Sequence, residues 1–94
     1  MTSRVRTHPG EVLREEYLEP LGLSARQVAE AIGVPANRIS DIVRERRGMT
    51  ADTAIRLGRY FKLDPRFWLN LQQNHELSKA EAETDYSGIP TRAA

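Results

Sequence analysis

The stretch GVPANRISDIV, residues 33 to 43, contains polar side chains of the types that hydrogen-bond to nucleic-acid bases. Asparagine can form two hydrogen bonds with adenine, arginine can form two with guanine, and aspartate can accept one from cytosine. Asn37, Arg38 and Asp41 lie within the stretch, and Arg44 follows it directly. Together they have the chemistry of base readout, provided that one exposed surface presents them.

A helix over about residues 36–44 would present them in this way. At about 100° per residue, one side is apolar and consists of Ala36, Ile39, Ile42 and Val43. The opposite side and its flanks are polar and consist of Asn37, Arg38, Ser40, Asp41 and Arg44. Simple surface ion pairs are an alternative, because Asp41 is three residues from both Arg38 and Arg44. Asp41 is also the least favourable residue for readout, since a carboxylate near phosphates needs a partner.

A second short helix is predicted before this one, separated from it by about three residues. Ser24 and Gln27 have the spacing of a capping box, in which each side chain accepts a hydrogen bond from the other residue's backbone. Gly33 can form the sharp corner between the helices, and Val34 can fill it with an apolar side chain. The pattern predicts a helix-turn-helix, a motif whose second helix enters the major groove of DNA.

Groups suited to phosphate binding flank the predicted motif. Arg26 lies near its start, and Arg46 and Arg47 follow its second helix. Helix N-termini at Ser24 and Thr50 offer free backbone N–H groups for the same purpose. The predicted phosphate contacts are therefore Ser24, Arg26, Gln27, Arg46, Arg47 and Thr50.

The rest of the chain predicts three more helices and two chain ends. Pro9 can begin the first helix, Thr50 can cap the fourth, and Asp64 can cap the fifth, which carries Phe67, Trp68 and Leu71. The fold class is thus an all-α bundle of five helices. We expect an N-terminal arm over residues 1–7, the folded domain over 8–77, and a helix end with an acidic flexible tail over 78–94.

Composition limits the alternatives. The 94 residues suffice for one domain, the net charge is +1, and there are no cysteines for disulfides or thiolate metal sites. No long apolar run predicts a membrane span or a signal peptide, so we expect a cytoplasmic protein. Metal-ligand spacing, a nucleophile with its base, and a glycine-rich phosphate loop are all missing from the sequence. We therefore expect no enzyme activity, no metal and no cofactor.

Four segments in order identify a resemblance to a known family. They are HPGE, then LGLS with VA, IGVP and NRIS, then RRGMTADTA with RL, and finally PRFWLNLQ. Over residues 8 to about 77, the chain resembles the HigA antitoxins of the lambda-repressor-like (Xre) group. The resemblance implies a lambda-repressor-like fold and an antitoxin that neutralises a HigB-type mRNA endonuclease. It also implies a homodimer that represses its own operon by binding double-stranded DNA at a palindromic operator.

The resemblance also assigns site residues. The recognition-helix positions are occupied by Ala36, Asn37, Arg38, Ser40, Asp41 and Arg44. We favour Asn37, Arg38 and Arg44 for base readout. Ala36 replaces the longer polar residue found in many relatives and can either touch a thymine methyl group or pack inward. For the implied dimer, Trp68 and Leu71 are interface candidates, although core packing would equally explain their spacing.

Two other functions remain open at this stage. A stand-alone Xre-type repressor with no toxin partner would have the same sequence core, and the neighbouring reading frame would distinguish it. A helix-turn-helix that binds only proteins is the other alternative, given the nearly neutral net charge. DNA binding with a strong dependence on salt would exclude the protein-only role, since phosphate contacts release counterions.

Overall fold

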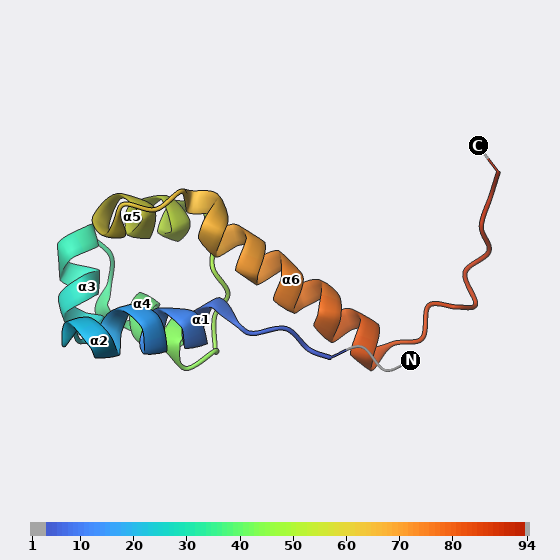
Figure 1. Cartoon of the computed structure of the whole chain (residues 1–94), viewed down its shortest axis with the longest axis horizontal. Helices are drawn as coiled ribbons and strands as arrows, with labels where there is room; N and C mark the ends of the chain where they lie inside the picture. The colour runs from blue at the N-terminus through green and yellow to red at the C-terminus, as the bar shows by residue number, and fades with distance from the viewer. Residues whose placement is uncertain (1–3, 94) are drawn as a thin grey trace.

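The structure is a computed structural model of the chain and describes residues 4–93. Its helices follow in the order α1 Pro9–Val12, η1 Leu13–Leu18, α2 Glu19–Leu21, α3 Ala25–Ile32, α4 Ala36–Val43, α5 Ala51–Phe61 and α6 Pro65–Glu83. Because α1, η1 and α2 are continuous, they make one helix, and the predicted all-α bundle of five helices is confirmed (Figure 1). Residues 4–93 contain no strand. None of the helices within this range is both long enough and apolar enough to cross a membrane.

The first helix contains a wide turn that the sequence pattern did not predict. Over the 6 residues of η1 the helix has π geometry, and the N–H of Glu19 donates to the carbonyl of Arg14, five residues earlier. Pro20 follows directly, and a proline inside a regular α-helix has no N–H and clashes with the preceding turn. A local π turn is a known way to adjust the hydrogen bonding of a helix without ending it. The helix therefore continues through Pro20 to Leu21.

The predicted helix starts are confirmed by their caps. Side chains accept hydrogen bonds from the backbone of the first turn at His8, Ser24, Thr50 and Asp64. At α3 the capping box is complete, with 3.0 Å from the N–H of Gln27 to Ser24 Oγ and 2.8 Å from the N–H of Ser24 to Gln27 Oε1. An N-cap contributes about 0.5–2 kcal/mol. The caps therefore fix where the first helix, α3, α5 and α6 begin, whereas α4 begins after Pro35 without a side-chain cap.

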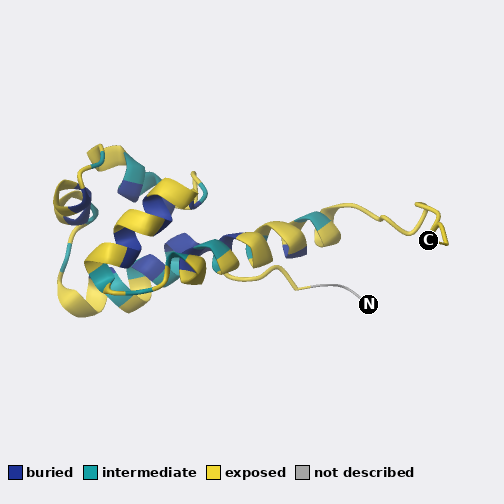
Figure 2. Cartoon of the chain, turned by 90° about the horizontal axis from the view of Figure 1, so that it is seen from above, coloured by how far each residue is buried: buried dark blue, intermediate teal, exposed yellow. Residues whose placement is uncertain are grey.

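The core lies where the helices face one another, as the dark blue segments of Figure 2 show. Its buried apolar residues are Leu13, Leu18, Val28, Ala29, Ile32, Ile39, Ile42, Met49, Ala54, Leu57 and Trp68. They come from the long first helix, from α3, α4 and α5, from the loop before α5, and from the first turns of α6. One apolar cluster thus holds all the helices in place.

Trp68 is part of this core and is 0% exposed in the single chain. Its ring lies 5.3 Å from that of Tyr17 and 5.0 Å from that of Phe67, measured between centroids. The prediction that Trp68 lies at a dimer interface is therefore wrong, because the core of its own chain already encloses the side chain. Leu71 is half-buried against the same core, and its role in a dimer stays a prediction.

The N-terminal segment from residue 4 onward lies along α6, as Figure 1 shows. The backbone N–H of Arg6 donates to Ser78 Oγ at 2.7 Å, and the carbonyl of Arg6 lies 2.8 Å from His75 Nδ1. The predicted arm over residues 1–7 is thus held to α6 by the backbone of Arg6, and residues 1–3 lie outside the described part. At the other end, α6 extends to Glu83, and residues 84–93 are exposed.

The first helix meets α4 at Gly10, more closely than a side chain would permit. A Cβ atom added at Gly10 would overlap the carbonyl group of Ile42. Both residues are buried, and the N–H of Gly10 donates to His8 Nδ1 at 2.9 Å. The missing side chain of Gly10 therefore lets the backbone of α1 rest directly on α4.

We expect Gly10→Ala to destabilise the fold by about 1–3 kcal/mol, since the added methyl group forces the two backbones apart. Urea unfolding followed by circular dichroism measures this change. Gly88→Ala is a matched control, because open space surrounds Gly88 in the tail. Equal stability of the two variants would contradict the close contact.

Two histidines meet beside this contact. The rings of His8 and His75 are edge to face, with centroids 4.9 Å apart and an angle of 78° between their planes. Burial, followed by repulsion from His75, lowers the pKa of His8 below its ordinary value of 6.5, and Lys79 adds to this effect while Glu45 opposes it. His8 is therefore held neutral, with its Nδ1 free to accept the capping hydrogen bond.

A lowered pKa in the folded state means that the unfolded chain binds the His8 proton more tightly. The stability of the fold should therefore decrease as the pH falls below about 6.5 and should not depend on His8 above that pH. Denaturant titrations at a series of pH values measure this. His8→Ser keeps a capping oxygen but removes the titrating ring, so its stability should depend less on pH. An unchanged pH dependence would show that another group is responsible.

Candidate nucleic-acid interface

The helices α3 and α4 form the predicted helix-turn-helix. Gly33 adopts the left-handed conformation, with φ 75°, that ends α3 and turns the chain. The N–H of Val34 then donates to the carbonyl of Ala29 at 3.0 Å, and the side chain of Val34 packs against the core. The corner is thus fixed by backbone hydrogen bonds and by one apolar side chain, as the sequence predicted.

The two sides of α4 differ as expected. Ile39 and Ile42 are both 0% exposed, whereas Asn37 and Arg44 project into solvent. Ala36 is exposed as well, so the alternative in which it packs inward is wrong. Ser40 is half-buried, and its hydroxyl lies 3.3 Å from the carbonyl of Asn37 on its own helix.

Arg38 does not pair with Asp41. Its Nη1 lies 3.3 Å from Oδ2 of Asp52, which belongs to the first turn of α5. Within residues 4–93, neither Asp41 nor Arg44 takes part in an ion pair within 4.0 Å. The alternative in which the polar residues of α4 only pair with one another is therefore not what the structure contains.

The predicted phosphate contacts lie on exposed surface, in two groups. Arg46 and Arg47 lie in the loop after α4, where Glu45 has a φ of 61° and the N–H of Arg46 donates to the carbonyl of Asp41 at 2.8 Å. The left-handed residue turns the chain sharply at the end of α4. Arg26 is exposed too, but it pairs with Glu30 on its own helix at 3.3 Å. Exposed pairs of this kind contribute little and exchange easily for a phosphate.

The other predicted groups are the residues of the helix starts. Ser24 and Gln27 form the capping box of α3, and Thr50 caps α5 by accepting from the N–H of Thr53 at 3.4 Å. Ser24, Gln27 and Thr50 are all exposed. Their side chains are occupied within the caps, so the groups they leave for a phosphate are N–H groups of the first helical turn.

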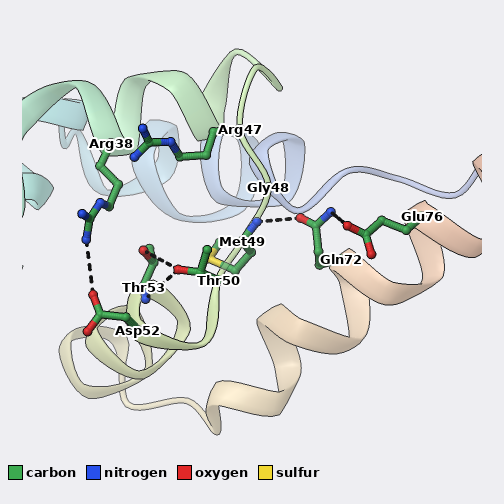
Figure 3. Close-up of a pocket in the computed structure, with 9 residues that line it drawn as sticks. All are labelled: Arg38, Arg47, Gly48, Met49, Thr50, Asp52, Thr53, Gln72 and Glu76. Carbon is green, nitrogen blue, oxygen red and sulfur yellow. Dashed lines mark hydrogen bonds and ion pairs between the residues drawn. The ribbon is translucent and has the colours of Figure 1, made fainter.

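A pocket of about 420 Å³ lies between the end of the motif and α6 (Figure 3). Arg38 and Arg47 line it from α4 and the following loop, together with Gly48, Met49, Thr50, Asp52, Thr53, Gln72 and Glu76. Gln72 Oε1 accepts a hydrogen bond from the buried N–H of Met49 at 2.6 Å, and Gln72 Nε2 donates to Glu76 at 3.1 Å. A side chain of α6 thus anchors the loop that carries Arg46 and Arg47.

Sequence reasoning missed Asp52 and Gln72 as parts of the site. Asp52 belongs to α5 and Gln72 to α6, and both lie outside the predicted helix-turn-helix and its flanking basic residues. For Asp52 the sequence did contain a signal, since Arg56 follows four residues later, at the spacing of a helical ion pair. No local pattern could have revealed Gln72, because its partner Met49 lies 23 residues earlier.

We expect Gln72→Met to cost about 1–3 kcal/mol of stability, because the buried N–H of Met49 would lose its acceptor. Thermal or urea unfolding measures the loss. Gln73→Met, at the exposed neighbouring position, is the matched control and should be close to neutral. Similar stabilities for the two variants would mean that Gln72 does not hold the loop.

Comparisons with known proteins agree with this geometry. A family model described as Helix-turn-helix matches residues 15–68. Virulence-associated protein I of Dichelobacter nodosus is 58% identical over 76 residues, which cover 81% of this chain and 70% of the relative. The solved structure of the Pseudomonas aeruginosa antitoxin HigA with the higBA promoter is 49% identical, with a TM-score of 0.81 over 84% of this chain and 85% of that chain.

A second solved structure, the antitoxin GraA in complex with its operator, covers 100% of this chain and 98% of its own. Its TM-score is 0.92 and its identity 37%. The chain therefore belongs to the helix-turn-helix family and, within it, to the HigA-type antitoxins, as its motifs predicted.

Proposed function

We propose that the chain is the antitoxin of a HigBA-like toxin–antitoxin module and a sequence-specific repressor of its own operon. The observation that carries the proposal is the exposed polar side of α4, set on a buried apolar side within a helix-turn-helix. The 49% identity to an antitoxin HigA solved with its promoter supports the same function. The protein would act on the chromosome in the bacterial cytoplasm.

In this proposal α4 lies in the major groove. Asn37, Arg38 and Arg44 contact base edges, with Ala36, Ser40 and Asp41 beside them. Arg46 and Arg47 bind phosphates, together with Arg26, the start of α3 at Ser24 and Gln27, and the start of α5 at Thr50. The three readout residues are exposed or partly exposed along one helix, which supports the assignment.

The proposed functional unit is a homodimer on a palindromic operator. Two copies related by a twofold axis would place their α4 helices about 34 Å apart, one turn of DNA. Leu71 remains our candidate for the interface. The second partner is a HigB-type toxin, an mRNA endonuclease, which the antitoxin binds and neutralises.

Asn37→Ala should weaken operator binding by about 1–3 kcal/mol and relax the preference at one base position, because one pair of base-specific hydrogen bonds is lost. Gel-shift titration on the protein's own promoter, with an unrelated duplex as competitor, measures both effects. Asn74→Ala, an exposed asparagine of α6, is the matched control. Unchanged operator affinity in Asn37→Ala would contradict the assignment of α4.

Arg46→Ala should act differently, since a phosphate contact carries no sequence information. It should weaken binding to the operator and to unrelated DNA alike, and lower the slope of log affinity against log salt by about 1. The same titration, repeated at several salt concentrations, gives that slope. A loss confined to the operator would instead place Arg46 among the residues that read bases.

A stand-alone repressor without a toxin is the second candidate, and the DNA experiments do not distinguish it. Co-expression with the neighbouring reading frame does. For an antitoxin, the neighbouring protein should arrest growth when expressed alone, and this chain should restore growth and co-purify with it. A harmless neighbour that does not bind this chain would favour the stand-alone repressor.

A further inference from the structure

A chain of polar contacts connects the recognition helix to α3 and α5. Arg56 Nη1 donates to the carbonyl of Ile32, at the end of α3, at 2.7 Å. Arg56 Nε lies 3.1 Å from Asp52 Oδ2, and the same oxygen lies 3.3 Å from Arg38 Nη1 on α4. One carboxylate thus joins an arginine that is anchored on the end of α3 to an arginine of the proposed reading helix. Figure 3 shows the last of these contacts, between Asp52 and Arg38.

The three contacts of Arg56, Asp52 and Arg38 differ in strength. The bond from Arg56 to Ile32 is the shortest of the three and is partly buried, and it satisfies a carbonyl that the end of a helix leaves free. Asp52 lies in the first turn of α5, where the helix dipole favours a negative charge. Arg56 and the helix dipole therefore both favour the observed position of the carboxylate, which contacts the partly buried Arg38 on its other side.

This restraint leaves Arg38 able to read a base. The guanidinium carries five N–H donors, and the ion pair with Asp52 involves only Nη1. An arginine already fixed in position loses less rotational freedom when it binds a base edge. Without Asp52, the side chain could swing toward the nearest phosphate on any DNA sequence.

The charge of Asp52 has a second effect. A carboxylate beside the DNA surface repels phosphates and lowers affinity for all sequences equally. This repulsion alone leaves the ratio of operator affinity to non-specific affinity unchanged. A gain in specificity must come from the position that Asp52 gives to Arg38, which favours a base contact over a phosphate contact.

We propose that Asp52 is a positioning residue for sequence specificity, which directs Arg38 toward the bases and disfavours contacts with phosphates alone. The inference rests on the proposed function, since it requires α4 to read DNA. It concerns the ratio of operator affinity to non-specific affinity, rather than operator affinity itself.

The test compares Asp52→Asn with the unaltered protein by fluorescence titration on operator DNA and on an unrelated duplex. The specificity ratio should fall about tenfold in Asp52→Asn, within the range of one arginine–guanine contact. Affinity for the unrelated duplex should rise at the same time. Asp64→Asn is the matched control, because it removes the same charge at the exposed start of α6 and keeps a capping side chain.

Two further variants separate positioning from simple stability. Asp52→Glu keeps the charge but displaces the carboxylate, so the specificity ratio should fall without a rise in non-specific affinity. In an Arg38→Ala background, Asp52→Asn should no longer change the base preference at the position that Arg38 reads. Circular dichroism of each variant verifies that its fold is intact.

The outcomes are distinguishable. If the unaltered protein prefers its operator and Asp52→Asn leaves the ratio unchanged, the positioning role is wrong while the proposed function stands. If the effect of Asp52→Asn persists unchanged in Arg38→Ala, the role is also wrong, because it does not act through Arg38. If the unaltered protein shows no preference for its operator, both the proposed function and this inference fail.

Discussion

The structure depends most on the burial of the apolar side of α4 in the shared core, together with the close contact between α4 and the first helix. Ile39 and Ile42 are completely enclosed, and Gly10 lets α1 approach until it touches the carbonyl of Ile42. Because this side of the helix cannot rotate away from the core, the opposite side has a fixed direction. The outward position of Asn37 is therefore a consequence of packing, and the polar residues of α4 contribute little to it.

The charge of the chain is nearly balanced overall, and only some of the arginines of the motif have an acidic partner. The net charge of the whole chain is only +1, and the arginines around α4 include one that is paired with Asp52. A strongly positive surface would bind any DNA, since attraction to phosphates does not depend on sequence. Near-neutral charge with a few exposed arginines favours a protein whose affinity depends on matched contacts. The same feature that left a protein-only role open in the sequence is thus compatible with selective DNA binding.

Much of the fold could be predicted because the decisive signals are local. Caps such as Ser24 with Gln27, and the left-handed corner at Gly33, lie within a few residues of the groups that they satisfy. The features that the sequence did not predict depend on contacts between residues far apart in the chain. The contact of Trp68 with Tyr17 and the pairing of Arg38 with Asp52 exist only when the helices are already packed. A sequence pattern shows which face is apolar but not what covers it.

In α4 the buried residues hold the fold, and the exposed residues are not needed for it. This separation also affects how related proteins can diverge in sequence. The exposed residues Asn37 and Arg44 form no side-chain hydrogen bond or ion pair within residues 4–93, so exchanging them should leave the fold nearly untouched. Related copies in one genome could then acquire separate targets through a few substitutions, without compensating changes in the core. Arg38 is the exception, because it is tied to Asp52, and these two positions should change together during evolution. Among the three proposed readout residues, the fold therefore leaves Asn37 and Arg44 free to change and restricts Arg38.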